Sequence, residues 1–442
     1  MSEAPAGPVV DPGALIRSKD YRRLLVISAL VGLLVSMASW CFLELVHWIQ
    51  QGVYVDLPSG LGFSDVPWWW PLPVLAVAGL VTAVAVLRLP GHGGHIPYEG
   101  IKGGQTLPSS VPGVLLAGLA SLGLGLVLGP EAPLIALATG LAIFAVRRAR
   151  KDTPDQVMSV IAAAAAFAAL ATIFGSPVVG AVILIEAAGL GGPTLPLVLL
   201  PGLMAAGIGS LVFIGLDNWA GLSNSDYALS PFALPAYSSP TFSDFVWALA
   251  LSVVAAGVSF AIVELARRSD HLVGRKPWLL IPGVGLVVAV LAIVFAQITG
   301  QSADVVLFSG EGAFDSMFAQ AATLSLGTLF LLLVLKSAAW SLSMGSFRGG
   351  PTFPALFVGA VGGLLAAHLP GFSETPAVAA LMGATAVAIL RLPLSSVVIA
   401  MLLTSRAGLA TAPIIIVAVV ASYITIETLS AKRPRSQVTA AP

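Results

Sequence analysis

Long apolar runs alternate with short polar segments along almost the whole chain. Several runs reach the ~20 residues that an α-helix needs to cross a bilayer, and those at 194–216, 245–263 and 277–303 contain no ionised side chain. The pattern predicts an all-α, polytopic membrane protein. The apolar segments are 24–50, 68–90, 111–128, 132–146, 155–172, 177–190, 194–215, 245–266, 277–299, 320–343, 353–369, 375–391, 393–405 and 410–429.

The composition agrees with this pattern. Of the 442 residues 57% are hydrophobic and 10% are charged, and the mean hydropathy of +0.96 exceeds that of soluble domains. A net charge of zero gives no electrostatic reason to expect a nucleic acid as partner. The single Cys41 excludes a disulfide framework and a thiolate metal site, and we expect neither a metal nor a cofactor.

Lys and Arg residues are unevenly distributed and predict an orientation. By the positive-inside rule their four clusters lie in the cytoplasm, together with both termini, and the polar loop that carries Asp217, Asp226 and Asp244 lies outside. The clusters are Arg17, Lys19, Arg22 and Arg23; Arg147, Arg148, Arg150 and Lys151; Arg267, Arg268, Arg275 and Lys276; and Lys432, Arg433 and Arg435.

Three apolar segments, 132–146, 177–190 and 393–405, are too short to cross a core of ~30 Å and predict half-helices that end inside the membrane. Their proline breaks recur in both halves of the chain, at 129–133 and 350–354 and again at Pro177 and Pro393. The alternative to an internal repeat is that Pro and Gly occur at matching places in these Ala-rich helices by chance.

We therefore expect two inverted-topology helical repeats with broken, re-entrant helices. The first repeat covers about 24–215 and the second about 245–430, within one membrane domain 24–430. A cytoplasmic segment 1–23 precedes this domain and a short cytoplasmic tail 431–442 follows it.

A helix that begins inside a membrane presents unpaired N–H groups and a partial positive charge, for which an anion is a natural partner. The chain offers three such starts, "GHGGHIPYEG" at 91–100, "GPEAP" at 129–133 and "GGPTFP" at 349–354. Neutral donors of this kind bind an anion weakly enough to release it, as conduction requires.

In these motifs the sequence resembles the CLC family of chloride channels and chloride/proton antiporters, over about residues 24–430. The family's motifs are of the types GSGIP, G(K/R)EGP and GxFxP. They correspond here to Gly93-Gly94-His95-Ile96-Pro97, Gly129-Pro130-Glu131-Ala132-Pro133 and Gly350-Pro351-Thr352-Phe353-Pro354, and "FGSPVVGAVILIE" follows the second motif.

The resemblance implies that Glu131 is the gating glutamate, whose carboxylate lies in the anion path, swings aside and carries a proton. The alternative role is a carboxylate that only stabilises its own helix N-terminus, by ~0.3–1 kcal/mol. The implied anion-binding residues are Gly94, His95, Ile96, Ala132, Thr352 and Phe353.

Several positions depart from the family pattern. Gly94 replaces the filter serine and so removes one donor, His95 introduces a titratable ring, and the filter tyrosine has no match near the C-terminus. Pro351 lacks an N–H, so Thr352 and Phe353 must supply the donors there. His92 and His95 suggest a metal pair, but no carboxylate or cysteine pattern completes one.

The proton path also departs from the family's antiporters. Glu186 matches the first of two expected glutamates, but Ala187 replaces the second, and adjacent helical residues point ~100° apart. Glu186 is therefore a possible proton-path residue, and obligatory proton coupling is in doubt. Lys336 either adds positive potential to the anion path or snorkels to a membrane interface.

The expected function is transport of chloride or a similar small anion by a channel-like or weakly proton-coupled protein, with a chloride/proton antiporter as the alternative. An intramembrane hydrolase is a distant alternative, because no serine motif faces a histidine at membrane depth. The resemblance implies a homodimer with one pore in each subunit. The short loops, and a tail too short for the cytoplasmic regulatory domains that many eukaryotic members carry, favour a prokaryotic cell membrane. The expected partners are the anion, protons and lipid, and we expect no enzymatic activity.

Overall fold

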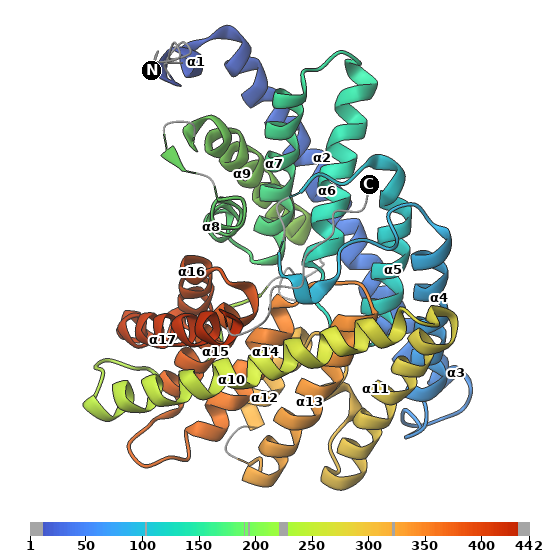
Figure 1. Cartoon of the computed structure of the whole chain (residues 1–442), viewed down its shortest axis with the longest axis vertical. Helices are drawn as coiled ribbons and strands as arrows, with labels where there is room; N and C mark the ends of the chain where they lie inside the picture. The colour runs from blue at the N-terminus through green and yellow to red at the C-terminus, as the bar shows by residue number, and fades with distance from the viewer. Residues whose placement is uncertain are drawn as a thin grey trace, which may run out of the picture. The chain divides into compact units, whose positions relative to one another are not determined.

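The computed structural model describes residues 12–101, 104–189, 191–192, 195–220, 229–320 and 323–431. Their regular structure is helical, which confirms the predicted all-α class (Figure 1). The α-helices are α1 Pro12–Arg17, α2 Lys19–Gln51, α3 Leu57–Gly60, α4 Pro71–Arg88, α5 Val111–Gly123, α6 Glu131–Ala149, α7 Asp155–Ile173, α8 Pro177–Ala187, α9 Leu195–Ala220, α10 Phe242–Val273, α11 Pro277–Thr299, α12 Phe314–Gln320, α13 Leu326–Ser346, α14 Thr352–Ala366, α15 Glu374–Leu390, α16 Pro393–Leu403 and α17 Ala412–Ala431.

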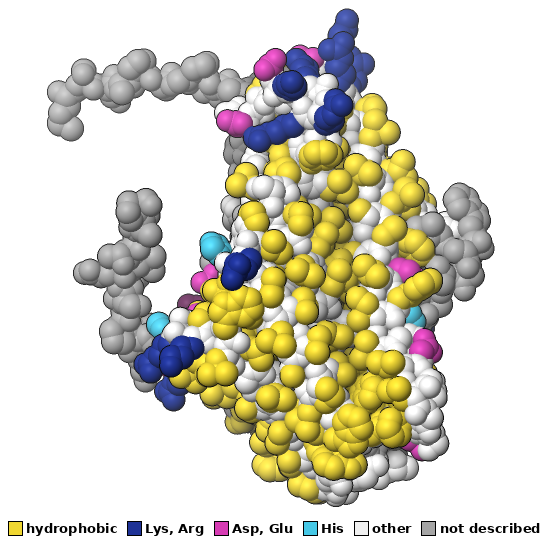
Figure 2. Space-filling model, turned by 90° about the vertical axis from the view of Figure 1, so that its right-hand side faces the viewer, with side chains coloured by type: hydrophobic (Ala, Val, Ile, Leu, Met, Phe, Trp, Pro, Cys, Tyr) yellow, Lys and Arg dark blue, Asp and Glu magenta, His cyan; other side chains and the backbone are white. Residues whose placement is uncertain are grey.

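Within the described residues, nine helices are long and apolar enough to cross a membrane. Many of their outward side chains are large and apolar, as on α10 and α11, where Leu249 and Leu279 are exposed. Figure 2 shows one face of the molecule, on which hydrophobic side chains dominate. Helices suit this environment because all backbone groups are paired within the segment, so the chain forms a multi-pass membrane protein.

The short helices α8 and α16 agree with the sequence analysis. Each has 11 residues, begins with a proline and reaches about half of the bilayer core, at 1.5 Å per residue. Ser176 caps α8, since its Oγ accepts the Val179 N–H at 3.4 Å. The prediction for 132–146 was wrong in length, because α6 has 19 residues and continues through Arg147 and Arg148. Basic residues in the last turn interact favourably with the negative end of the helix dipole, so the helix continues beyond its apolar run.

The chain divides into two compact units that interleave along the sequence. In its described part the first unit contains α1, α2 up to Glu44, α6 from Leu134, and α7 to α9. Here α7 packs against α8 and α9. A Cβ on Gly32 of α2 would overlap the backbone of Ala205 on α9, so the missing side chain permits this close helix contact.

The second unit contains the end of α2, α3 to α5 with the start of α6, and α10 to α17. Helix α4 packs on α11, and α15 packs on α10, α14 and α17. Every residue of α15 from Thr375 to Leu390 is buried, which makes this helix the centre of the unit. Gly359 and Gly363 of α14 lie against its backbone, where a Cβ on Gly359 would be 2.6 Å from the Met382 Cα.

The order of helices repeats along the chain. A helix of 19 or 15 residues begins at each of the breaks at 129–133 and 350–354, and then come a second helix, an 11-residue helix and a long helix, as α6 to α9 and as α14 to α17. This order agrees with the two predicted repeats. The domain limits stay predictions, and residues 1–11 and 432–442 lie outside the described part of the chain.

We expect the substitution Gly359→Ala to lower the thermal unfolding temperature in detergent, because its Cβ forces α14 away from α15 at a cost of about 1–3 kcal/mol. Gly362→Ala in the same helix is the matched control, since its Cβ would meet only the Leu381 Cδ1, at 3.6 Å. Equal unfolding temperatures for the two variants would contradict this account of the α14–α15 contact.

Candidate functional site

The two helix breaks meet in the second unit through their glycines. Gly129 N–H donates to the Gly350 carbonyl at 2.7 Å and Gly350 N–H donates to the Gly129 carbonyl at 2.6 Å, which forms an isolated antiparallel bridge. The bridge precedes the first turn of α6 and the first turn of α14. It therefore places two helix N-termini, each with unpaired N–H groups, beside each other.

Glu131, the first residue of α6, is fully buried at this bridge. Its Oε1 accepts the N–H of Phe353, the second residue of α14, at 3.2 Å. Within the described part of the chain, Oε2 of Glu131 and the neighbouring Oγ1 of buried Thr352 have no hydrogen-bond partner. The carboxylate thus lies where the dipole of α14 favours a negative charge.

The glycines of the bridge make room for this carboxylate. A Cβ on Gly350 would overlap Oε2 of Glu131, and one on Gly129 would lie 2.8 Å from the carboxyl carbon. Ala132, the second residue of α6, and Thr352 are close to the same bridge in the sequence. Of the predicted anion-binding residues, Ala132, Thr352 and Phe353 are therefore placed around the Glu131 carboxylate.

The Gly93–Pro97 motif forms a turn in the loop after α4 of the same unit. Gly93 and Gly94 adopt φ of +74° and +99°, a region that favours glycine. The Gly94 N–H donates to the Gly91 carbonyl at 2.8 Å, so this predicted donor is used within the turn. The His95 ring bonds the Gly100 carbonyl at 3.0 Å and lies 3.5 Å from Glu99, while Ile96 is half-buried ahead of a 3₁₀ turn.

Lys336 of α13 is fully buried, so the alternative that it snorkels to an interface is wrong. Its Nζ donates to the carbonyls of Val305, Leu307 and Phe308 at 2.9, 2.7 and 3.2 Å and lies 4.5 Å from the centre of the Phe357 ring. The ammonium therefore fixes the segment between α11 and α12. The Phe308 N–H in turn donates to the Gly125 carbonyl at 3.0 Å, which ties this segment to the loop that leads to α6.

The sequence analysis missed Glu311, which lies in the same segment as a 3₁₀ turn begins. Oε1 of Glu311 is buried and has no partner among the described residues. Burial raises the pKa of this carboxyl well above its usual value, and the charge of Glu131 raises it further. The only sequence feature that could have indicated Glu311 is its place between two glycines in "SGEGAF". A glutamate outside an apolar run is usually interpreted as an ordinary loop residue.

The sequence analysis also missed Arg348, which is 9% exposed and directly precedes Gly349 and Gly350. Its Nη1 donates to the Phe347 carbonyl at 3.0 Å, and its Cγ would lie 3.3 Å from a Cβ on Gly93. Arg348 therefore lies between the first and third motifs. Its signal was that no other Lys or Arg occurs between Lys336 and Arg391.

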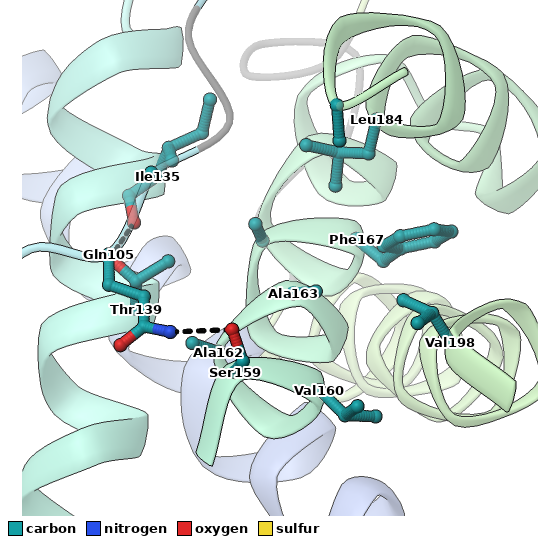
Figure 3. A pocket seen from close by; sticks show the side chains of 13 residues that line it. Gln105, Ile135, Thr139, Ser159, Val160, Ala162, Ala163, Phe167, Leu184 and Val198 are labelled. Carbon is teal, nitrogen blue, oxygen red and sulfur yellow. Dashed lines mark hydrogen bonds between the residues drawn. The ribbon is translucent and has the colours of Figure 1, made fainter. Parts of the chain in front are cut away.

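Glu186 belongs to the first unit, where it is half-buried near the end of α8. This unit also holds a cavity of about 330 Å³ between α6, α7, α8 and α9, shown in Figure 3. Gln105 Nε2 donates to Ser159 Oγ at 2.8 Å on one side of the cavity, and Phe167 and Leu184 form an apolar side. None of the described side chains that line the cavity is charged, so it offers no electrostatic attraction for an anion.

The fold and the site define a multi-pass helical membrane protein in which two broken helices present their N-termini to one buried carboxylate. Residues 98–426 match the family described as voltage gated chloride channel. This match covers well over half of the chain, which therefore belongs to that family, the CLC family of anion transporters, and is not an enzyme.

Curated relatives and solved structures agree with this family. The chain is 28% identical over 358 residues to the "Putative ion-transport protein YfeO" of Salmonella paratyphi A, which covers 79% of this chain and 81% of that protein. A slow cyanobacterial Cl⁻/H⁺ antiporter has the same fold with a TM-score of 0.75, 18% identity and coverage of 93% and 95% of the two chains. A CLC-type fluoride/proton antiporter matches with a TM-score of 0.67 and 18% identity, over 91% of this chain and 95% of that chain.

We expect Lys336→Met to destabilise the protein, because three carbonyls lose their donor and the buried one, that of Leu307, is left unpaired at a cost of about 1–3 kcal/mol. Thermal unfolding in detergent measures the effect. Lys151→Met removes an exposed lysine and serves as the control. The tethering role of Lys336 is refuted if both variants unfold at the wild-type temperature.

Proposed function

We propose that the protein carries chloride, or a similar small monovalent anion, across the membrane, and that Glu131 is its gate. One observation supports this most directly. The Glu131 carboxylate accepts the Phe353 N–H at the N-terminus of α14, which is a place that suits a free anion equally well. A carboxylate in this position competes with the transported anion for the same donors.

The mechanism follows from this competition. When Glu131 is ionised, its charge occupies the helix N-termini and repels an incoming anion. When it is protonated or rotated away, the N–H groups at the start of α6 and α14, including those of Ala132, Thr352 and Phe353, become available. Neutral N–H donors hold an anion without a full opposite charge, so the anion can leave again.

The mode of transport in this proposal is channel-like or weakly proton-coupled. The solved structures of the same fold include a chloride/proton and a fluoride/proton antiporter. In this chain Glu186 is a possible proton-path residue, but Ala187 follows it and contributes no carboxyl group. A chloride/proton antiporter, favoured by the titratable gate, is the second candidate.

The proposal includes a homodimer with one pathway in each subunit, in a cell membrane and with cytoplasmic termini. The orientation rests on the basic clusters. Arg150 and Lys151 between α6 and α7, and Arg267 and Arg268 near the end of α10, are exposed, as residues in contact with an aqueous phase should be.

We expect chloride efflux from liposomes with the wild-type protein to rise as pH falls, because protonation removes the charge of the Glu131 carboxylate. Glu131→Gln is uncharged at every pH and should give an efflux that changes less than about twofold between pH 4.5 and 7.5. Glu264→Gln removes a carboxylate at the Arg268 ion pair and is the control. A pH profile of Glu131→Gln that matches the wild type would sink the gate assignment.

Simultaneous measurement of chloride and proton fluxes distinguishes the two modes. We expect a proton flux that is small or absent relative to the chloride flux, and unable to be driven uphill by a chloride gradient. A fixed ratio that permits uphill proton movement and is lost in Glu186→Gln would establish the antiporter instead.

A further inference from the structure

Arg348 carries a buried charge whose hydrogen-bonding capacity is largely unused. A guanidinium has five N–H donors and stays protonated at any physiological pH. Nη1 uses one donor on the Phe347 carbonyl, whereas Nε is buried without a partner among the described residues. In the described part of the chain no carboxylate lies within ion-pair distance of it. The negative charge of Asp270 favours the protonated form of Arg348, and Asp270 Oδ2 accepts a hydrogen bond from the Tyr98 hydroxyl at 2.9 Å.

The surroundings of Arg348 belong to the anion motifs. Its backbone N–H donates to Ser121 Oγ at 3.3 Å, which fixes the chain at this point. The side chain then passes Gly93, where a Cβ would lie 3.3 Å from its Cγ. Gly94 follows with no side chain of its own, and Gly349 and Gly350 lead from Arg348 to the bridge at Glu131.

A buried charge without adequate partners is strongly unfavourable, unless an ion of opposite sign completes its coordination. Ordinary structural arginines solve this problem with a carboxylate or with several carbonyls. Arg348 has one carbonyl as a partner and lies between two of the predicted anion-binding motifs.

We propose that the Arg348 guanidinium binds the transported monovalent anion at a second position, between the Gly93–Gly94 turn and the Gly129–Gly350 bridge. The inference rests on the proposed function and adds a ligand that none of the three motifs contains. The side-chain donor that Gly94 cannot supply is provided here by an arginine from the other half of the chain. Because the guanidinium is a planar fork, it should favour a planar oxyanion such as nitrate more than an ammonium would.

Chloride and nitrate binding to the purified full-length protein, measured by isothermal titration calorimetry in detergent, tests the proposal. Arg348→Met should weaken chloride binding about tenfold or more, since a charged hydrogen-bond donor is lost. Arg348→Lys keeps the charge and should bind chloride within about threefold of the wild type while its nitrate-to-chloride affinity ratio falls. Arg267→Met removes an exposed charge that stacks on Tyr98 and should change both affinities less than about twofold.

The outcomes separate the inference from the proposed function. Wild-type chloride affinity in a folded, monodisperse Arg348→Met protein overturns the inference, even if liposomes still show anion flux. If Arg348→Met does not purify, an unchanged nitrate-to-chloride ratio in Arg348→Lys overturns it. Chloride binding that depends on Arg348 in a wild-type protein without anion flux supports the binding site and refutes transport.

Discussion

The paired hydrogen bonds between Gly129 and Gly350 are the contact on which the arrangement of the site depends. A helix that starts inside a membrane leaves its first N–H groups without water, so each start needs a partner. The bridge solves this problem for two helices together, because it brings their N-termini to one carboxylate. With a larger residue at Gly350 the Glu131 carboxylate would have no place beside α14.

Three buried charges in the second unit differ in how fully they are coordinated. Lys336 donates to three carbonyls and packs on an aromatic ring, which is the coordination of a structural cation. Glu131 has a partner for one of its two oxygens, and Arg348 has one carbonyl. Burial alone therefore does not mark a functional charge. The useful distinction is between a charge whose partners are complete and one that leaves hydrogen-bonding capacity for an ion.

Much of the fold was predictable, because hydropathy and proline position report on helices locally. The short helices that begin at Pro177 and Pro393 were found from length and proline alone. The end of α6 was not found, since Arg147 and Arg148 end the apolar run but continue the helix. Membership of the family also followed from local motifs, and the family match over 98–426 confirmed it.

The candidate site was predictable only as a set of motifs. The pairing of Gly129 with Gly350 joins residues about half the chain apart, and no local pattern encodes which breaks meet. The coordination of Lys336 depends on carbonyls, which every residue type supplies, so the sequence left its two alternatives open. Arg348 was overlooked for the same reason: its neighbour Gly93 lies more than 250 positions earlier.

The close contact of Gly359 and Gly363 with α15 has a consequence for the speed of gating in the proposed mechanism. With its backbone held against a fully buried helix, α14 cannot withdraw the Phe353 N–H without disturbing the centre of the unit. Opening then requires only rotation about the few side-chain bonds of Glu131. Collective helix movements take microseconds to milliseconds, and the rotation of a single side chain does not require them. A gate built on this rigid frame opens by moving one buried side chain while its helices stay in place.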